Sequence, residues 1–107
     1  MDTWVTTYFD AWTSGDPHAV VACFDPEVEF EDMPTGHRAH GLDEARAFVE
    51  RAYEKAPGAR YVAVHSLTHQ DEYVIEWVME PMGLRGASVG TLRAGRILTN
   101  RDYWSAP

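Results

Sequence analysis

The sequence predicts one α+β domain, because segments with helical periodicity come first and segments with strand periodicity follow. Helical spacing of apolar residues occurs in three segments before residue 57. From residue 60 onward, four segments alternate like strands joined by short turns, which indicates an antiparallel meander rather than βαβ units. A chain of 107 residues supports one core and not two. We therefore expect residues 1–107 to form a single domain.

The three predicted helices have clear start and stop signals and cover residues 3–13, 17–24 and 42–56. Gly15 ends the first helix, and the Asp16–Pro17 pair begins the second. The second must end before Asp25, because a residue that precedes proline is biased away from the helical region. The first helix carries a heavily aromatic inner stripe made of Trp4, Val5, Tyr8, Phe9 and Trp12.

Strands are predicted over residues 28–32, 60–67, 73–80, 85–92 and 96–104. In the first of them, Val28, Phe30 and Asp32 share one face, so the carboxylate of Asp32 follows two apolar side chains inward. The segment 33–41 is rich in Pro and Gly and is expected to be a loop over the mouth of whatever lies beneath. The segment 85–92 is rich in Gly, Ala and Ser, which permits another layer or subunit to approach closely.

The last strand carries the most informative pattern. Ile97, Thr99, Arg101 and Tyr103 form one face, and the other face is formed by Leu98, Asn100, Asp102 and Trp104. The second face combines an indole with a carboxylate and an amide, which suits neither a solvent face nor a dry core. Apolar walls with a few converging polar groups are typical of a small-molecule cavity. The alternative is an edge strand whose Asp102 pairs with an arginine at the surface.

The charge balance argues against a nucleic-acid partner, because nine basic residues face seventeen acidic ones and the net charge is -8. No apolar run approaches the ~20 residues that span a bilayer, and no signal peptide is seen. A lone Cys23 cannot form an intrachain disulfide, which suits a reducing cytoplasm. We expect a cytoplasmic protein with a small apolar ligand as its partner and with no membrane or nucleic acid.

Together, the helix–Gly-Asp–helix order, the early strand that ends in an inward Asp32 and the terminal Gly-Arg-Ile…Asp-Tyr-Trp segment resemble the SnoaL-like, nuclear-transport-factor-two-like superfamily. The resemblance covers nearly the whole chain. It implies a curved antiparallel sheet that wraps around the N-terminal helices as a cone, encloses a pocket and usually dimerises with a second copy. Fold alone does not fix function here, since the superfamily hosts isomerases, cyclases, epoxide hydrolases and non-catalytic binders.

Particular residues are similar to those of ketosteroid isomerases: Tyr8 on the first helix, Gly15-Asp16 between helices, and Asp32 at a strand end before Met33-Pro34. The resemblance implies that Tyr8 donates a hydrogen bond to the oxyanion and that Asp32 is the base. The second donor departs from that family, because the matching position is Ser88, a weaker neutral hydroxyl. Asp102 is similar instead to the inward aspartate of the cyclases and of limonene-epoxide-hydrolase-like members.

Proton abstraction beside a carbonyl needs a base near the acidic carbon and a donor at the oxygen. We expect Asp32 or Asp102 to be the base, Tyr8 to be the donor, and one carboxyl pKa to rise because two carboxyls share a dry pocket. The expected substrate-binding residues are Trp12, Phe30, Tyr73, Trp77, Ser88, Asn100 and Trp104. For Asp32 the alternative is a turn cap, and for Tyr8 it is a core phenol bonded to a backbone carbonyl.

A metal or other cofactor is not expected. His37 and His40 lie three residues apart on a Gly-flanked segment, but no cysteine and no His-Glu-x-x-His pattern accompanies them. The leading hypothesis is thus a cofactor-free isomerase or cyclase for a small apolar carbonyl compound such as a steroid or polyketide. A non-catalytic binding or dimerisation module is the alternative. Epoxide hydrolysis is third, because residues 73–80 contain no arginine for the Arg-x-Asp pair that those hydrolases need.

Overall fold

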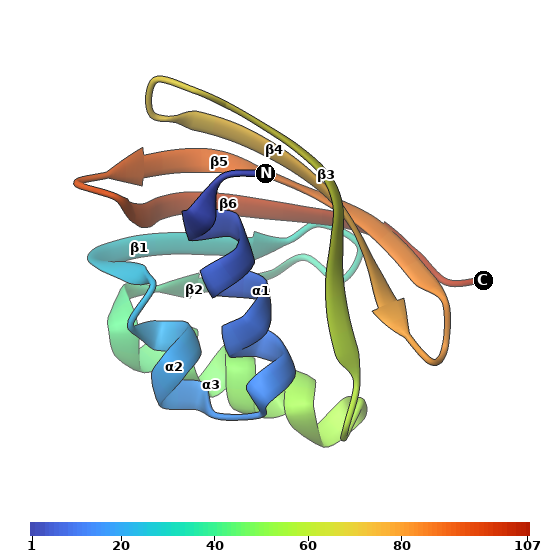
Figure 1. The fold of residues 1–107 in the computed structure, drawn as a ribbon. Coiled ribbons are helices and arrows are strands. Elements are labelled where there is room, and N and C mark those ends of the chain that lie inside the picture. Colours follow the sequence, from blue (N-terminus) through green and yellow to red (C-terminus); the bar gives the residue numbers. More distant parts are fainter.

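A curved, unclosed six-stranded sheet covers three helices in the computed structural model, which describes all 107 residues (Figure 1). In chain order the elements are α1 (Thr3–Ser14), α2 (Pro17–Val21), β1 (Phe24–Asp32), β2 (His37–His40), α3 (Gly41–Lys55), β3 (Arg60–His69), β4 (Glu72–Glu80), β5 (Leu84–Arg93) and β6 (Arg96–Ser105). The α+β class predicted from the sequence is confirmed. No helix is long and apolar enough to cross a bilayer.

The sheet has the strand order β2-β1-β6-β5-β4-β3 and is mixed rather than wholly antiparallel. β1 runs parallel to β6, and every other neighbouring pair is antiparallel. The parallel pair arises because the chain leaves β1, forms α3 and the meander, and returns beside β1 in the same direction. This return places Asp32 directly opposite Asp102 in the register of the two strands.

Three predictions about the segments around β1 are wrong. The second helix ends at Val21 rather than near residue 24, and β1 begins at Phe24, four residues earlier than expected. Residues 37–40 are not loop but the edge strand β2, which pairs antiparallel with β1. This strand is too short and too polar to be predicted from the sequence. Pairing with β1 defines it, with Ala39 buried opposite Phe30.

The alternation predicted for the last strand is broken by one extra residue. Leu92 pairs with Ile97 and Thr91 pairs with Thr99, so Leu98 has no counterpart on β5. Such a bulge reverses the side-chain alternation. Ile97, expected on the outer face, is therefore buried in the core at 1% exposure, and beyond the bulge Asn100 is buried at 1% exposure as predicted.

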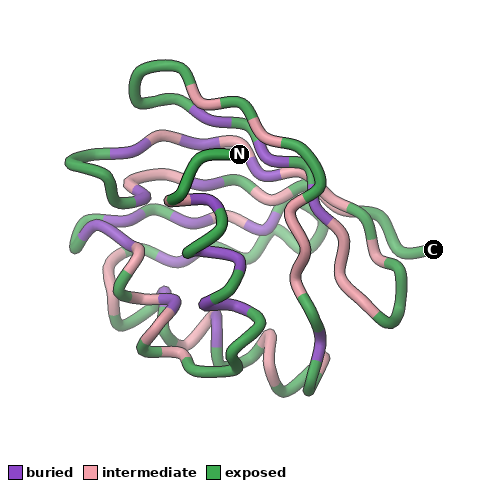
Figure 2. Tube along the Cα trace, in the orientation of Figure 1, coloured by how far each residue is buried: buried purple, intermediate pink, exposed green.

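The core lies between the helices and the concave face of the sheet, where buried segments of α1, α3 and the central strands face one another (Figure 2). Aromatic rings fill much of it, including an edge-on pair of Trp4 and Tyr73 and a tilted pair of Phe30 and Phe48.

Candidate functional site

A cavity of about 440 Å³ opens between the concave face of the sheet and the helices α1 and α3. Twelve of its nineteen lining residues are hydrophobic, so the walls suit an apolar ligand. The polar minority includes two carboxylates from adjacent strands, Asp32 at the end of β1 and Asp102 on β6. Two acids that are 70 positions apart in the sequence thus share one apolar space.

All three residues predicted to be catalytic, Tyr8, Asp32 and Asp102, line this cavity. Of the predicted substrate-binding residues, those on the cavity wall are Trp12, Trp77, Ser88 and Trp104. The other three do not reach the wall. Phe30 is 2% exposed and belongs to the core, and Tyr73 and Asn100 are buried behind Asp102. The strand alternation predicted that these three side chains point inward. Whether each one reaches the cavity depends on the neighbouring strands that cover it.

Two hydrogen-bonded chains converge on a single oxygen of Asp102. In one chain, the Tyr73 hydroxyl donates to Asn100 Oδ1 at 2.6 Å, and Asn100 Nδ2 donates to Asp102 Oδ1 at 2.7 Å. In the other chain, the Trp77 indole N–H donates to Ser88 Oγ at 2.9 Å, and Ser88 Oγ donates to Asp102 Oδ1 at 2.6 Å. An indole nitrogen can only donate, so the Ser88 hydroxyl must point its own proton at Asp102.

This arrangement leaves the second oxygen of Asp102 free. Oδ2 accepts no hydrogen bond from the protein, whereas Oδ1 accepts two. Because Oδ1 is occupied by donors, any proton on this carboxyl must sit on Oδ2. Asp102 therefore offers a ligand one oxygen whose orientation is fixed by groups on three strands.

Two glycines on β5 make room for both hydrogen-bonded chains. Gly86 lies opposite Trp77 and Gly90 lies opposite Tyr73 in the strand register. A Cβ at Gly86 would overlap the Trp77 ring, and one at Gly90 would lie only 2.5 Å from the Tyr73 hydroxyl oxygen. The small residues noted in the sequence thus let aromatic side chains of β4 lie across β5 within the same chain.

Burial raises the pKa of Asp102 from its ordinary value of 3.8 to about 6, and the charge of Asp32 adds to this effect. The hydrogen bonds from Ser88 and Asn100 act in the opposite direction, because they stabilise the carboxylate. The sequence predicted a raised carboxyl pKa in the cavity, first for Asp32 and then for one acid of the pair, and the raised pKa is found at Asp102. A carboxyl with this pKa is ionised at neutral pH but accepts a proton more readily than an exposed aspartate does.

Asp32 has a different environment, since both of its oxygens accept hydrogen bonds. Trp104 Nε1 donates to Oδ1 at 2.6 Å, and Thr35 Oγ1 donates to Oδ2 at 2.5 Å. The His37 backbone N–H donates to Thr35 Oγ1 at 3.2 Å, which leaves the Thr35 proton for Asp32. Asp32 is thus held from both sides by the β1–β2 turn and by β6.

Tyr8 reaches the cavity from α1 and is 3% exposed. Its hydroxyl donates to no protein group, unlike that of Tyr73 or Tyr53, although the Trp12 side chain interacts with it and lowers its pKa. An indole N–H can only donate, so the Tyr8 proton is not used in that contact. Burial, and secondly the charge of Asp102, raise the pKa of Tyr8 well above its usual value of 10. The phenol therefore stays protonated, and its O–H is available to a ligand close to Asp102.

Twelve of the nineteen residues on the cavity wall were not predicted as site residues, and the polar ones among them include Thr35, Arg51, Lys55 and Tyr61. The Tyr61 hydroxyl is buried and has no hydrogen-bond partner, and burial raises the pKa of Tyr61 to about 12. His37, which the sequence marked only as an unlikely metal ligand, also lies on the wall. The charge at Arg51 and Lys55 signals a solvated helix face in the sequence, and only the packing of α3 shows that this face borders the cavity.

Elsewhere in the chain, no three His, Cys, Asp or Glu side chains converge in a way that could hold a metal ion. Cys23 lies outside the cavity, and burial raises its pKa, which makes the thiol less reactive.

The sequence matches the family model of the SnoaL-like domain over residues 5–100. The chain belongs to the SnoaL-like domain family. No curated protein matches it at a significant level. Solved structures with this SnoaL-like fold support the assignment, at sequence identities that establish the fold alone.

One is a hypothetical protein with a ketosteroid isomerase-like fold from Catenulispora acidiphila, crystallised in complex with trimethylamine, with a TM-score of 0.91, 20% identity, and coverage of 98% of this chain and 87% of the other. Another, provisionally assigned as a polyketide cyclase, is from Sinorhizobium meliloti, with a TM-score of 0.83, 20% identity, and coverage of 96% and 95%. A third, provisionally assigned as an isomerase of the SnoaL-like family, is from Agrobacterium tumefaciens, with a TM-score of 0.79, 24% identity, and coverage of 97% and 96%. The resemblance drawn from the sequence is thereby confirmed.

Proposed function

We propose that this SnoaL-like domain is a cofactor-independent enzyme that isomerises or cyclises a small, mostly apolar carbonyl compound. Asp102 is the base and Tyr8 is the donor to the carbonyl oxygen. The observation that carries the proposal is the pairing of a free, oriented Asp102 oxygen with a protonated phenol that donates to no protein group, both in one apolar cavity. The provisional labels of two similar structures, a polyketide cyclase and an isomerase, point to the same class of chemistry.

The reaction begins when Asp102 Oδ2 takes a proton from the carbon next to the carbonyl group. The C–H electron pair becomes the C=C bond of an enolate, and negative charge moves to the oxygen, where the Tyr8 O–H stabilises it. In an isomerisation, Asp102 returns the same proton to a different carbon of the conjugated system. In a ring closure, the enolate carbon instead attacks a second carbonyl of the same molecule, and that oxygen receives the proton.

Asp102 suits the role of base better than Asp32 does, for two reasons. Both oxygens of Asp32 already accept hydrogen bonds, whereas Oδ2 of Asp102 accepts none. In addition, Asp102 and Tyr8 line the same cavity, and the charge of Asp102 contributes to the raised pKa of Tyr8. Base and oxyanion donor must be neighbours, because the acidic carbon and the carbonyl oxygen are separated by a single carbon. Asp32 then contributes by keeping the Asp102 pKa high.

The test uses a panel of β,γ-unsaturated ketones, with formation of the conjugated enone followed by absorbance and exchange of the α-proton followed in D2O. Asp102→Asn is expected to lower kcat by about 10²–10⁴-fold while ligand still binds, because it removes the base and keeps the shape. Asp32→Asn is expected to cost less, with a shift of the pH–rate profile to lower pH. If Asp102→Asn retains full turnover, the assignment of the base is wrong.

A second candidate function is a non-catalytic site for a small organic cation. It is favoured by the trimethylamine bound in the similar Catenulispora acidiphila structure, together with the aromatic walls and two carboxylates of this cavity. Aromatic faces and carboxylates attract alkylammonium ions. Calorimetric titration with trimethylammonium chloride tests this idea, and binding that Asp102→Asn abolishes would support it, provided that no ketone in the panel is turned over. Epoxide hydrolysis gains no support, since neither cavity carboxylate forms an ion pair with an arginine.

We also propose that two copies associate through the outer face of the sheet. Four large apolar side chains of β3, β4 and β6 are at least 44% exposed: Val64, Leu67, Val74 and Tyr103. Leu67 and Val74 lie opposite each other on adjacent strands and form an exposed apolar pair. Sedimentation equilibrium tests this association, and a monomer at high concentration would refute it.

A further inference from the structure

The polar groups of the cavity are divided by sign. The carboxylates of Asp32 and Asp102 come from the sheet, whereas the basic side chains on the wall, Arg51 and Lys55, come from the last two turns of α3. His37 of the edge strand β2 lies on the wall as well, and Arg51 Nη2 contacts His37 Nε2. Both Arg51 and Lys55 are largely exposed, so they stand at the rim rather than in the floor.

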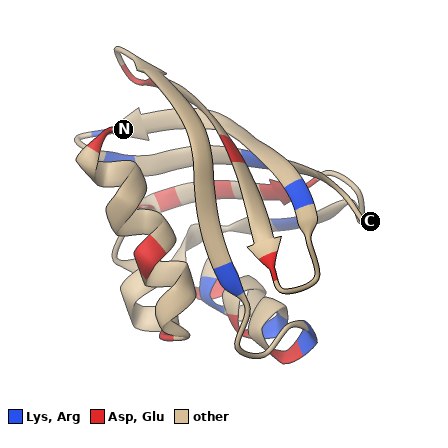
Figure 3. Ribbon diagram, turned by 45° about the vertical axis from the view of Figure 1, so that its right-hand side comes forward, with Lys and Arg blue, Asp and Glu red and all other residues tan.

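These two cations lack the partners that most others have. Four of the nine basic side chains form ion pairs with carboxylates: Arg38, Arg46, Arg60 and Arg93. Arg51 and Lys55 form none, although α3 also carries several acids and its basic and acidic segments interleave (Figure 3). Two cations without a carboxylate partner thus border an apolar cavity in a chain of net charge -8.

The spacing of the two cations also matters. Arg51 and Lys55 are four positions apart on a helix, so they lie on the same face, and like charges at this spacing repel each other weakly. The Arg51 guanidinium is held against His37, whose ring in turn packs 5.8 Å from that of Phe48 on the same helix. An anion placed between these groups would relieve the repulsion and accept several donors at once.

We infer that the ligand of this cavity is amphipathic, with an apolar body and an anionic group such as a carboxylate that Arg51 and Lys55 bind at the rim. This inference rests on the proposed function and narrows its substrate class to carbonyl compounds with an acidic group, such as keto acids. With the anion at α3, the apolar body lies between the aromatic walls, and the opposite end of the molecule reaches Tyr8 and Asp102. The carboxylates in the floor would repel the anion and so enforce this direction.

The test uses two fluorescent probes that differ only in one anionic group. 1-Anilinonaphthalene-8-sulfonate and N-phenyl-1-naphthylamine share the same rings, and only the first carries a sulfonate. Both gain fluorescence in an apolar cavity. The natural protein is expected to bind the sulfonate at least as tightly as the neutral probe, in spite of its negative net charge, and added salt is expected to weaken only the sulfonate.

The double variant Arg51→Gln/Lys55→Gln is expected to lower the affinity for the sulfonate about tenfold and to change that for the neutral probe less than twofold. The matched control is Arg96→Gln, which removes an unpaired cation at the start of β6, away from the cavity wall. It is expected to leave both affinities unchanged. Circular dichroism checks that each variant is folded.

Three results would overturn the inference. Equal losses for both probes in the double variant would mean that the two side chains act through packing and not through charge. An unchanged affinity for the sulfonate would mean that no anion is held at the rim, while the catalytic proposal would still stand on the ketone assay. If neither probe binds the natural protein, the cavity does not take ligands of this size, and both proposals fail.

Discussion

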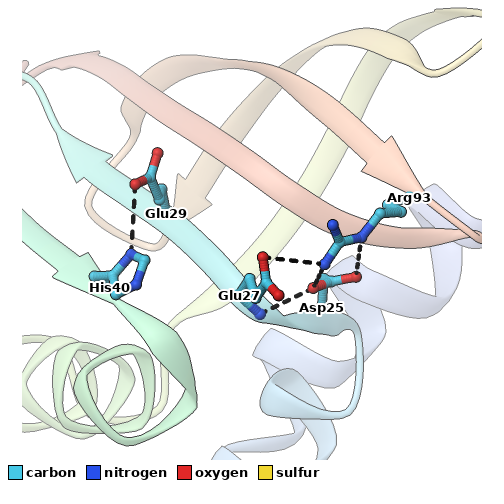
Figure 4. Close-up of polar contacts among 5 residues, drawn as sticks. All are labelled: Asp25, Glu27, Glu29, His40 and Arg93. Carbon is cyan, nitrogen blue, oxygen red and sulfur yellow. Dashed lines mark hydrogen bonds and ion pairs between the residues drawn. The ribbon is translucent and has the colours of Figure 1, made fainter.

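Asp25 at the start of β1 and Asp102 on β6 are two acids with opposite electrostatics. Asp25, 6% exposed at the start of β1, accepts two hydrogen bonds from Arg93 at 2.7 and 2.9 Å and one from the Glu27 backbone N–H at 2.9 Å (Figure 4). This Asp25–Arg93 clamp holds the pKa of Asp25 below its usual value of 3.8. Asp102 has neutral donors only and no cation, and its pKa is raised to about 6.

The difference shows how a partner decides what a carboxylate does. The Arg93 guanidinium donates to both oxygens of Asp25, which keeps this carboxyl ionised and joins the start of β1 to the end of β5. The neutral donors Ser88 and Asn100 bind only one oxygen of Asp102, so they fix the orientation of the carboxyl and leave it able to gain or lose a proton. The clamp is thus suited to holding strands together, and the cavity acid is suited to exchanging a proton. The exposed pair of Glu29 and His40, 3.4 Å apart, contributes to neither role (Figure 4).

The largest expected effect separates activity from stability. Asp102→Asn should lower turnover of a ketone substrate by about 10²–10⁴-fold, because the base is lost, and should not lower the melting temperature at pH 8. Asp25→Asn should lower the melting temperature, because Arg93 loses the carboxylate that accepts its two hydrogen bonds. It should retain kcat at temperatures below its unfolding transition. Kinetics and thermal unfolding of both variants measure this. A loss of kcat in Asp25→Asn at a temperature where it is fully folded would contradict the division.

The second prediction concerns the pH dependence of stability, which should have opposite signs for the two acids. Asp102 binds its proton more tightly when folded, so its contribution is fully present below about pH 4 and is lost as the pH rises through about 6. The loss is on the order of 3 kcal/mol. Asp25 has a lowered folded pKa, so its contribution is present above about pH 4 and is lost as the pH falls further.

Urea unfolding from pH 3 to pH 8 measures both effects when the natural protein is compared with each variant. The free energy of unfolding of Asp102→Asn should exceed that of the natural protein at pH 8 and converge with it near pH 4. Asp25→Asn should fall below the natural protein at pH 8 and approach it in acid. An Asp102→Asn curve that runs parallel to the natural one would show that the Asp102 pKa is not raised.

The third prediction concerns the support behind Asp102. Gly86→Ala should destabilise the protein by about 1–3 kcal/mol, because the added Cβ overlaps the Trp77 ring that donates to Ser88. The Asp25–Arg93 clamp does not depend on a glycine at position 86, so the pH dependence of stability assigned to Asp25 should persist in this variant. Combining Gly86→Ala with Trp77→Phe should recover part of the loss, because the smaller ring leaves room. Additive losses in this double-mutant cycle would rule out the proposed overlap.

The smallest expected effect comes from the tyrosine hydroxyls. Tyr61→Phe removes a buried hydroxyl without a partner, so stability should stay the same or rise by about 1 kcal/mol. The control is Tyr53→Phe, which removes a hydroxyl that donates to the Trp12 carbonyl at 2.8 Å and should cost about 0.5–1.5 kcal/mol. Chemical denaturation measures both. A stability loss in Tyr61→Phe equal to that in Tyr53→Phe would mean that the Tyr61 hydroxyl has a bonding partner in solution.

The sequence by itself determined the α+β class, the three helices and the inward direction of Asp32, Asp102 and Trp104. Those features depend on periodicity and on Gly and Pro signals, which act within a few residues. The aromatic stripe of the first helix likewise predicted that Tyr8 points inward, and the resemblance to ketosteroid isomerases implied its place in the pocket.

Only the tertiary structure decided the pairings between distant segments. The edge strand β2, the early start of β1, the bulge at Leu98 and the parallel pairing of β1 with β6 all depend on which backbone lies alongside which. The depth of a side chain is equally non-local. Asn100 supports the cavity from behind, whereas Arg51 borders it, because neighbouring strands cover the first and the packing of α3 against the sheet positions the second.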